Sequence, residues 1–468
     1  MTERFDLVVV GAGTGGYPAA IRGAQLGLST LCVEKEYLGG VCLNWGCIPS
    51  KALIAATGLL ERIRHASEMG IRVQGLEVDV AAMQAWKAGI VRKLTGGIAQ
   101  LFRANGVQHR MGIARLRSPR SVEITAADGT RSLVEATRGI IVATGAAPIV
   151  LPGFEVDGRT VITAREAVSL ERAPGSMVII GGGVIGLELG MVYQKLGTRV
   201  TVVELTSSLL PGVDPDLVRV VERRLKRAGA EVLLEARARG LERTGDRAEV
   251  VVEHAGAERR LPCDVVLLAV GFRPQSRGLG LEELGVRLDE RGHVRTDELL
   301  RTNVPGIWAT GDVSGPPYLA HKATKEAEIA AEVIAGHKSA RDWVAMPAAI
   351  FTEPEIATVG LSEAEARAQG RRVRVGRFPF AASGRALALG DSDGLVKVVV
   401  DEEDHRVLGV GIVGPEAADL IGEASLALEM GACAEDVALT VHPHPTLGEG
   451  VMEAFKHALG EAVHVLNK

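Results

Sequence analysis

DLVVVGAGTGG, residues Asp6–Gly16, runs from a short apolar segment directly into a glycine-rich turn. The glycines of this turn have the spacing G-x-G-x-x-G and stand at Gly11, Gly13 and Gly16. Between a strand and a helix, that spacing is typical of a turn that binds the pyrophosphate of a dinucleotide. One such string is weak support, because the chain has 57 glycines among its 468 residues.

The same arrangement recurs further along the chain and makes the interpretation much stronger. A second apolar run, Met177–Ile180, leads into glycines that follow their counterparts at one constant offset: Gly181, Gly183 and Gly186. An acid follows the last glycine at the same distance in both places, as Glu34 and Glu204. We therefore predict two βαβ units of equal length.

Each predicted unit has the parts that a dinucleotide requires. The free N–H groups and the dipole of a helix N-terminus attract a pyrophosphate, and an acid after the next strand accepts hydrogen bonds from a ribose. The alternative is that one unit is a degenerate relic. Two working sites indicate redox chemistry between two dinucleotides. The segment LTSSLL after Glu204 has no arginine for a 2′-phosphate, which favours NAD over NADP at the second site.

Length and composition limit the remaining possibilities. A chain of 468 residues is expected to form two to four domains. A net charge of −5 gives no reason to expect a nucleic-acid or membrane partner, and no apolar run approaches the roughly 18 residues of a membrane span. The N-terminus has no signal-peptide pattern, so we expect a cytoplasmic protein, in which a stable structural disulfide would be unusual.

Three further segments read as buried strands that return to a parallel sheet: Gly139–Pro148, Asp264–Pro274 and Asn303–Val313. After Pro347 the runs alternate in the manner of antiparallel strands. The predicted fold is α/β, with two Rossmann-like domains and a C-terminal α+β domain. The predicted boundaries are 1–147 and 148–272 for the two dinucleotide-binding domains, 273–345 for a central domain and 346–468 for the last domain.

The segment GGVCLNWGCIPSK contains two of the five cysteines, Cys42 and Cys47. Five steps along a regular helix rise about 7.5 Å, so a disulfide requires Cys42 to lie in a loop or a distorted turn, which the flanking glycines permit. A helix start would also favour a reactive thiolate. Zinc binding and plain core packing are the alternatives, although zinc lacks a second Cys or His pair nearby, and no metal site is predicted. The other cysteines read as packing residues: Cys32, Cys263 and Cys433.

Other chemically interesting residues are ambiguous by themselves. VHPHPTLGEG contains His442 and His444, which could be a catalytic base or part of a rigid turn. Lys51 and Glu188 could be ordinary solvated charges.

On these residues the chain is identified as a member of the pyridine nucleotide–disulfide oxidoreductases, a resemblance that covers nearly its full length and is most specific in GGVCLNWGCIPSK. The resemblance implies a redox-active Cys42–Cys47 disulfide, with Cys47 facing a flavin and Cys42 exchanging with substrate. The match HPTxxE selects His444 as the base, with Glu449 holding its other ring nitrogen. It further implies a homodimer, in which this dyad serves the partner subunit, and a C-terminal dimerisation domain.

The same resemblance implies the cofactor residues. FAD would be bound by Gly11, Gly13, Gly16, Glu34, Lys51, Gly145, Asp312 and Ala320. NAD would be bound by Gly181, Gly183, Gly186, Glu204 and Gly271. Lys51 and Glu188 would form an ion pair beside the flavin. The chain departs from the family at Val41, which removes a hydroxyl that would reach the FAD phosphates, and at the bulky Trp45.

Within the family, the pattern is closest to enzymes that oxidise dihydrolipoamide with NAD⁺, the lipoyl group being carried by another protein of the E2 or H-protein type. Glutathione-type reductases remain an alternative, but they generally use NADP and have a second acid where Gly450 stands here. Mercuric and large thioredoxin reductases have a further redox pair at the C-terminus, which EAVHVLNK lacks. A soluble transhydrogenase would lack the paired cysteines. A redox-sensing or scaffolding role is the non-enzymatic alternative.

Overall fold

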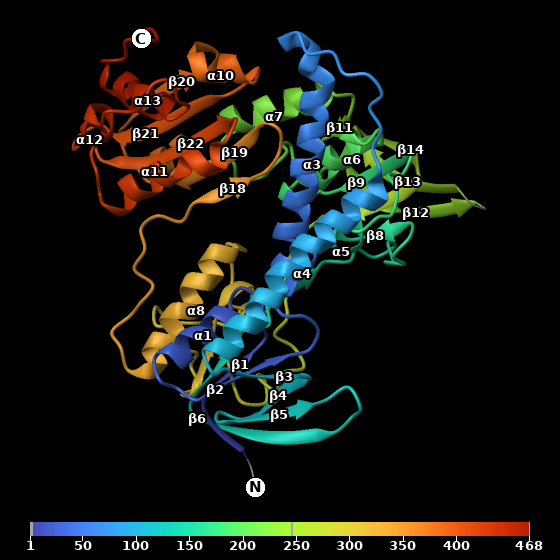
Figure 1. Ribbon diagram of the computed structural model, residues 1–468, viewed down its shortest axis with the longest axis vertical. Helices are drawn as coiled ribbons and strands as arrows, with labels where there is room; N and C mark the ends of the chain where they lie inside the picture. The colour runs from blue at the N-terminus through green and yellow to red at the C-terminus, as the bar shows by residue number, and fades with distance from the viewer. Residues whose placement is uncertain (1–2, 245–246, 468) are drawn as a thin grey trace. The chain divides into compact units, whose positions relative to one another are not determined.

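The structure is a computed structural model that describes residues 3–244 and 247–467. The chain divides into two compact units, each assembled from three separate segments (Figure 1). Unit 1 contains residues 1–53, 79–149 and 271–342, and unit 2 contains residues 54–78, 150–270 and 343–468.

Unit 1 is built on a seven-stranded sheet with the order β3-β2-β1-β6-β5-β4, and β17 pairs with the last residues of β6. Its strands are β1 (Glu3–Val10), β2 (Thr30–Glu34), β3 (Gln108–Met111), β4 (Ile113–Ser118), β5 (Ser121–Thr125), β6 (Arg131–Val142) and β17 (Ile307–Ala309). The pairs β1–β2, β2–β3, β1–β6 and β6–β17 are parallel, whereas β4 and β5 form an antiparallel edge. The carboxyl ends of β1 and β2 therefore lie at one edge of the sheet.

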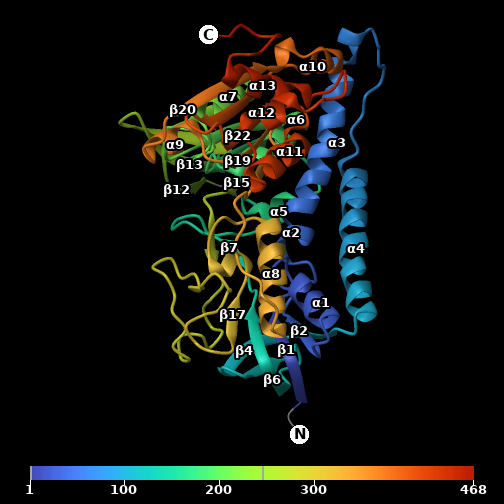
Figure 2. The same ribbon diagram turned by 90° about the vertical axis from the view of Figure 1, so that its left-hand side faces the viewer.

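Helices cover this sheet and begin at the functional loops. They are α1 (Tyr17–Gln25), α2 (Gly40–Asn44), α4 (Val80–Ala104) and α8 (Ala320–Ala335), with the short 3₁₀ segment η2 (Gly311–Ser314). Helix α3 (Cys47–His65) begins in unit 1 and continues into unit 2, which also contains the 3₁₀ segment η1 (Ala66–Met69). Helices α1 and α8 pack against each other and against the sheet (Figure 2). A further antiparallel pair, β7 (Ala146–Pro148) and β16 (Phe272–Pro274), completes unit 1.

Unit 2 contains a second parallel sheet, with the order β11-β10-β9-β15-β8. Its elements are β8 (Val161–Ile162), α5 (Ala164–Ala167), β9 (Ser176–Ile180), α6 (Val184–Lys195), β10 (Arg199–Val203), α7 (Pro215–Arg227), β11 (Glu231–Leu233) and β15 (Val265–Leu268). A three-stranded antiparallel sheet is inserted before β15: β12 (Arg237–Thr244), β13 (Arg247–His254) and β14 (Ala257–Cys263).

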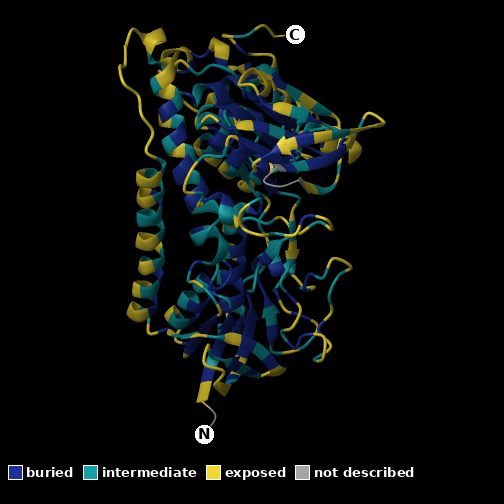
Figure 3. Cartoon of the chain, turned by 90° about the vertical axis from the view of Figure 1, so that its right-hand side faces the viewer, coloured by how far each residue is buried: buried dark blue, intermediate teal, exposed yellow. Residues whose placement is uncertain are grey.

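The rest of unit 2 is an antiparallel sheet with the order β18-β19-β22-β21-β20. Its elements are β18 (Ala348–Ile350), β19 (Glu355–Gly360), α9 (Glu363–Ala368), β20 (Val373–Pro379), η3 (Phe380–Ala382), α10 (Gly384–Leu389), β21 (Leu395–Asp401), β22 (Val407–Gly414), α11 (Ala417–Glu429), α12 (Ala434–Leu439) and α13 (Glu449–Leu459). One apolar core joins this sheet to α11, α12 and α13. Figure 3 colours the strands of each unit mainly as buried.

A charge cluster around the buried Lys397 ties helix α7 to the C-terminal antiparallel sheet of unit 2. Lys397 of β21 donates to Asp214 and Asp216 at the start of α7, over 2.8 and 2.7 Å. These bonds hold the pKa of Lys397 above its usual value, although burial alone would lower it. A buried lysine is tolerated only when it is paired in this way.

The fold class predicted from the sequence is confirmed. The three segments that begin at Gly139, Asp264 and Asn303 contribute to the strands β6, β15 and β17. Each of these strands pairs in parallel with a neighbour. The alternating segments after Pro347 form the antiparallel sheet. The four domain boundaries remain predictions.

Candidate active site

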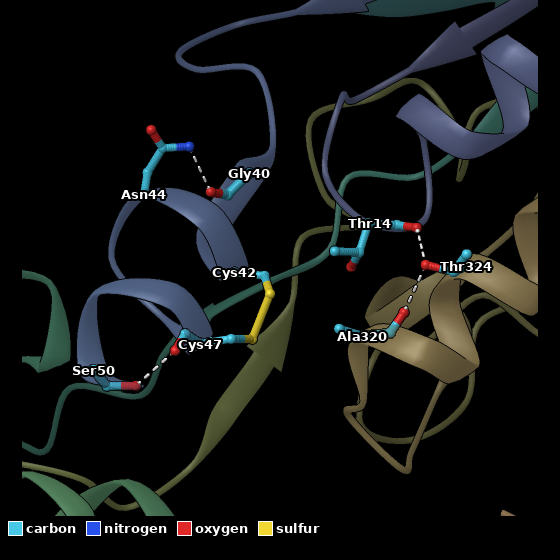
Figure 4. Close-up of a disulfide and its surroundings, with 8 residues drawn as sticks. All are labelled: Thr14, Gly40, Cys42, Asn44, Cys47, Ser50, Ala320 and Thr324. Carbon is cyan, nitrogen blue, oxygen red and sulfur yellow. Dashed lines mark hydrogen bonds between the residues drawn. A yellow bond between two sulfur atoms is a disulfide. The ribbon is translucent and has the colours of Figure 1, made fainter. Parts of the chain in front are cut away.

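Cys42 and Cys47 form a disulfide in unit 1, with their Cα atoms 4.6 Å apart. Figure 4 shows the bond joining the turn of Cys42 to the turn of Cys47. The chain achieves this spacing by interrupting the helix: α2 ends at Asn44, and α3 begins at Cys47 itself. The distorted turn expected from the sequence is thus a separate one-turn helix.

Gly46 allows the two turns to approach each other. A Cβ atom on Gly46 would lie 3.0 Å from the carbonyl oxygen of Val41 and 3.2 Å from the Cα of Cys42. Both neighbours are backbone atoms, which cannot rotate away. A larger residue at this position would therefore separate the cysteines.

The two sulfur atoms have different surroundings. Cys47 is the first residue of α3, which has 19 residues, whereas Cys42 lies inside the short α2. The N-terminus of a long helix stabilises negative charge, so a thiolate is better accommodated at Cys47 than at Cys42. This asymmetry suits a disulfide in which the sulfur of Cys47 leaves as a thiolate and the sulfur of Cys42 exchanges with a thiol.

The cysteine segment is attached directly to the first glycine turn. The N–H of Gly39 donates to the carbonyl of Ala12 over 2.8 Å. Gly40 has φ +57°, and a Cβ atom there would lie 2.6 Å from the Cα of Gly13. The disulfide is therefore held beside this turn by a backbone contact that only glycine allows.

Glu34 fixes the first glycine turn through its carboxylate. One oxygen of this buried acid accepts from the N–H of Ala12 over 2.7 Å, and the other accepts from the N–H of Glu36 over 2.8 Å. The sequence suggested only a ribose contact for Glu34. The structure adds that the acid shapes the turn.

The second turn, in unit 2, repeats this arrangement. Glu204 accepts from the N–H of Gly182 over 2.7 Å, and its other oxygen accepts from the N–H and hydroxyl of Thr206 over 2.7 and 2.8 Å. Gly182 and Thr206 are the counterparts of Ala12 and Glu36, at the same offset that relates the glycines. The repeat found in the sequence is thus a repeat of hydrogen bonds as well.

Both turns fit a bound pyrophosphate. Gly11 and Gly181 have φ +102° and +106°, and a Cβ atom on Gly16 or Gly186 would overlap the carbonyl oxygen of Gly11 or Gly181. These glycines bring each helix close to its strand. A Cβ atom on Gly183 would meet open space among the described residues, so the side of the second turn where a phosphate would lie is clear.

The helices that follow the turns present free N-termini. Among the described residues, no side chain caps α1 or α6, and the first turn of neither helix contains an acid. Their N–H groups and dipoles are therefore open to an anionic group.

Asp312 lies in η2 within a buried ionic network that the sequence did not reveal. Burial raises the pKa of Asp312, and Glu326 also raises it, whereas the cation of Lys322 lowers it. Lys322 lies 3.4 Å from Glu326 and donates to the carbonyl of Gly315 over 2.7 Å. The network orders the loop that carries Asp312.

The start of α8 is tied to the first glycine turn. The hydroxyl of Thr324 donates to the carbonyls of Ala320 and Thr14, over 3.0 and 3.4 Å (Figure 4). Ala320 is the first residue of α8. In the same unit, Gly145 follows β6 with φ +68°. All the residues predicted for FAD therefore belong to unit 1. Gly271, which was predicted for NAD, also lies in unit 1, where it precedes β16 with φ +107°, whereas the other predicted NAD residues lie in unit 2.

His444 and Glu449 form the predicted dyad in unit 2. The Nδ1 of His444 lies 2.9 Å from a carboxylate oxygen of Glu449, and the other oxygen accepts from the N–H of Thr446 over 2.8 Å. Burial raises the pKa of Glu449, but these two hydrogen bonds outweigh burial and lower it. The side chain of His444 is 80% exposed in the single chain.

The remaining predicted and packing residues are placed as follows. Glu188 of α6 is buried and accepts from the N–H of Phe351 over 2.9 Å. Lys51 belongs to unit 1 and Glu188 to unit 2, so their pairing stays a prediction. Cys32 and Cys263 are buried strand residues, whereas Cys433 is half-buried and caps α12.

Comparisons with known proteins agree with this geometry. Residues 5–327 match the family model described as pyridine nucleotide-disulphide oxidoreductase, and residues 346–455 match the model of its dimerisation domain. A dihydrolipoyl dehydrogenase of Geobacillus stearothermophilus is 46% identical, over 99% of this chain and 98% of that protein. One of Halobacterium salinarum is 48% identical over the same shares of the two chains.

Solved structures agree as well. The crystal structure of LpdA from Mycobacterium tuberculosis superimposes with a TM-score of 0.90 at 29% identity, over 97% of this chain and 99% of that chain. An HOCl-induced flavoprotein disulfide reductase of Escherichia coli gives a TM-score of 0.87 at 25% identity, with the same coverage. The chain therefore belongs to the pyridine nucleotide-disulphide oxidoreductases.

Proposed function

We propose that the protein is a dihydrolipoyl dehydrogenase, which oxidises dihydrolipoamide to lipoamide and reduces NAD⁺ to NADH. The observation that carries this proposal is the contact between the cysteine segment and the first glycine turn through Gly39 and Gly40. This contact holds the disulfide beside a glycine turn that can bind a dinucleotide. A dithiol reduces a disulfide by exchange, so the arrangement suits transfer of electrons from a dithiol to a dinucleotide.

The first glycine turn, in unit 1, would bind FAD. The second glycine turn, in unit 2, would bind NAD. When bound, FAD would accept an electron pair from the reduced cysteines and supply it to NAD⁺ as hydride. The FAD residues are those of the first glycine turn with Glu34, Lys51, Gly145, Asp312 and Ala320. The NAD residues are those of the second turn with Glu204 and Gly271, and no arginine follows Glu204 in LTSSLL to favour NADP.

The side chains of the protein would carry the thiol chemistry. Glu449 accepts the Nδ1–H of His444, which leaves the Nε2 lone pair free to take a proton from the substrate. The resulting thiolate attacks Cys42, the bond between the cysteines breaks, and Cys47 leaves as a thiolate at the N-terminus of α3. The second substrate sulfur then displaces Cys42, which closes lipoamide.

A second copy of the chain would complete the site. The C-terminal domain exposes large apolar side chains, among them Met430, Leu439 and Val441, the last 93% exposed. Residues 346–455 match the dimerisation domain of the family, which supports an interface between two copies of the chain. We propose a homodimer in which His444 of each subunit serves the disulfide of the other.

The substrate would be a lipoyl group on a separate E2 or H-protein type partner. We place the enzyme in the cytoplasm, where reducing conditions suit a cysteine pair that opens in every turnover. None of the described helices is long and apolar enough to span a membrane.

Two variants test the assigned roles. His444→Gln should reduce dihydrolipoamide turnover by roughly 100-fold or more, because the base is lost, but leave NADH oxidation by ferricyanide nearly unchanged. An equal loss of both activities would remove His444 as the proton acceptor. Cys47→Ser should abolish the long-wavelength thiolate–flavin absorbance of the reduced enzyme, and survival of that band would reverse the assignment of the two sulfurs.

The choice of substrate is tested by steady-state assay of the holoenzyme. Fast NAD⁺ reduction with dihydrolipoamide is expected. Turnover only with NADPH and glutathione disulfide would instead identify a glutathione-type reductase, and absence of turnover with either pair would favour a redox-sensing role.

A further inference from the structure

His293 is a buried histidine to which the proposed chemistry gives no task. Its side chain is only 4% exposed, and it lies between β16 and β17 of unit 1. Nδ1 lies 2.8 Å from a carboxylate oxygen of Asp289, and Nε2 lies 2.6 Å from the hydroxyl oxygen of Tyr318. The ring therefore joins two parts of the chain that are 25 residues apart.

Both contacts of this ring are hydrogen bonds. Burial raises the pKa of Asp289, but hydrogen bonds from the side chain and backbone of His293 outweigh burial and lower it, so an ionised Asp289 accepts from the Nδ1–H. A tyrosine hydroxyl can donate or accept, so Tyr318 bonds to Nε2 whether or not that nitrogen carries a proton. The link between the two segments does not depend on the charge of the ring.

The ring is also fixed relative to the loop of Asp312. Asp289 and His293 close one turn, in which the N–H of each donates to an oxygen of the other over 2.8 Å. The next residue, Val294, donates from its N–H to the carbonyl of Val313 over 2.8 Å. Val313 directly follows Asp312, so His293 is anchored to the loop that carries an acid predicted to bind FAD.

Tyr318 stands where this loop enters α8. The preceding residues, Pro316–Pro317, are exposed and have no N–H to donate. The ring of Tyr318 meets that of Phe272 in β16 edge to face, with centroids 6.4 Å apart, and its hydroxyl bonds to His293. A side chain therefore fastens the loop where two successive backbone donors are missing, two residues before Ala320, the first residue of α8.

The N-terminus of α8 lies beside the first glycine turn, because the hydroxyl of Thr324 donates to the carbonyls of both Ala320 and Thr14. Among the described residues, no side chain caps α8, and its first turn contains no acid. Its first N–H groups are therefore open to an anionic part of a cofactor. The position of these N–H groups depends on how the chain enters the helix.

We propose that His293 and Tyr318 are positioning residues of the FAD site: their hydrogen bond fixes the chain that leads into α8 and holds the N-terminus of this helix beside the first glycine turn. The inference rests on the proposed function, in which unit 1 binds FAD. Loss of the bond would let the entry of α8 move, so its N–H groups would meet the cofactor less well and FAD would bind more weakly.

The first test is the affinity of the holoenzyme for FAD. Tyr318→Phe keeps the ring against Phe272 but removes the hydroxyl, so we expect the Kd of FAD to rise by about threefold to tenfold, the effect of one hydrogen bond. The holoenzyme is diluted in steps, and the flavin released into the filtrate after ultrafiltration is measured by its visible absorbance. This measurement does not depend on turnover.

Two variants of His293 separate the two contacts of its ring. The amide of asparagine takes the place of Nδ1 and can still bond to Asp289, but it does not reach Tyr318. The longer side chain of glutamine brings its amide to the place of Nε2. His293→Asn should therefore raise the Kd of FAD as much as Tyr318→Phe does, whereas His293→Gln should stay within about twofold of wild type.

The combined variant and a control distinguish positioning from general stability. His293→Asn together with Tyr318→Phe should raise the Kd no further than either change alone, because both remove the same hydrogen bond. The matched control is Tyr193→Phe in unit 2, where the hydroxyl of Tyr193 donates to the carbonyl of Ala167. This control should lower Tm but leave the Kd of FAD unchanged, whereas a role limited to folding would make the Kd follow Tm in all variants.

Three results would overturn the inference: an unchanged Kd in Tyr318→Phe, equal losses in His293→Asn and His293→Gln, or additive losses in the combined variant. A wild-type protein that does not bind FAD would overturn the inference and the proposed function together. The expected pattern of Kd values in a protein that does not oxidise dihydrolipoamide would refute the proposed function alone and leave the roles of His293 and Tyr318 in place.

Discussion

Gly40→Ala should separate the disulfide from the first glycine turn. The new Cβ atom would lie 2.6 Å from the Cα of Gly13, a backbone atom, at a residue whose φ is +57°. The left-handed conformation costs a residue with a side chain about 1 kcal/mol or more, and overpacking against backbone costs about 1–3 kcal/mol. The segment can relieve this only by moving away from Gly13.

The consequence for activity follows from this movement. Displacement of a reacting group by about 1 Å can reduce a rate by roughly 100-fold. We therefore expect dihydrolipoamide turnover to fall by roughly 10-fold to 100-fold in Gly40→Ala. Electrons from NADH to ferricyanide do not pass through the cysteines in the proposed scheme, so that activity should fall by less than about threefold.

The matched control is Gly58→Ala in α3. A Cβ atom there would meet open space among the described residues, and alanine in a helix interior is more stable than glycine by about 0.5–1 kcal/mol. Both variants are assayed as FAD-loaded enzyme, with thermal unfolding measured alongside. If Gly40→Ala loses both activities in parallel, or if it retains full dihydrolipoamide turnover, the contact with Gly13 does not position the disulfide.

Two further results are expected. Glu204→Gln should raise KM for NAD⁺ by roughly tenfold without changing FAD content. The reason is that the single oxygen of an amide cannot accept from both Gly182 and Thr206. An unchanged KM would show that the turn keeps its shape without the acid. The pKa of Glu449 is lowered from 4.5, so its stabilisation is complete above that pH and is lost as the pH falls through the lower, native value. The stability difference between wild type and Glu449→Gln should therefore be constant from pH 6 to 8 and shrink below pH 4.5, as followed by urea unfolding.

Much of the fold could be predicted because its signals are local. The glycine spacing and the apolar runs define each strand–turn–helix unit, and one constant offset along the chain relates the two units. The dyad was predicted from the resemblance of HPTxxE to the family motif. Its two residues, His444 and Glu449, are close in the sequence, and a single turn at the start of α13 joins them.

Contacts between distant segments could not be predicted in this way. Gly40 meets Gly13 because two loops at the same edge of one sheet converge, and no spacing in the sequence specifies that distance. Lys322 and Glu326 form a buried pair that no local motif in the sequence indicates. The HPTxxE match selected His444 over His442. The contact of His442 with Glu423 could not be predicted because Glu423 lies on α11, a separate helix that begins well before it, at Ala417.

The repeated acids show why the two glycine turns can bind similar cofactors and yet serve different chemistry. In each unit a carboxylate holds its glycine turn through the same two N–H positions, so the part that receives a dinucleotide is common to both. What differs is the neighbour of the turn. The first turn contacts the cysteine segment through Gly39 and Gly40, whereas in the second the side chain of Leu209 lies against Gly182. One fold element thus occurs twice, and in the proposed function the residues packed against each turn determine whether its dinucleotide would exchange electrons with sulfur or only with the other dinucleotide.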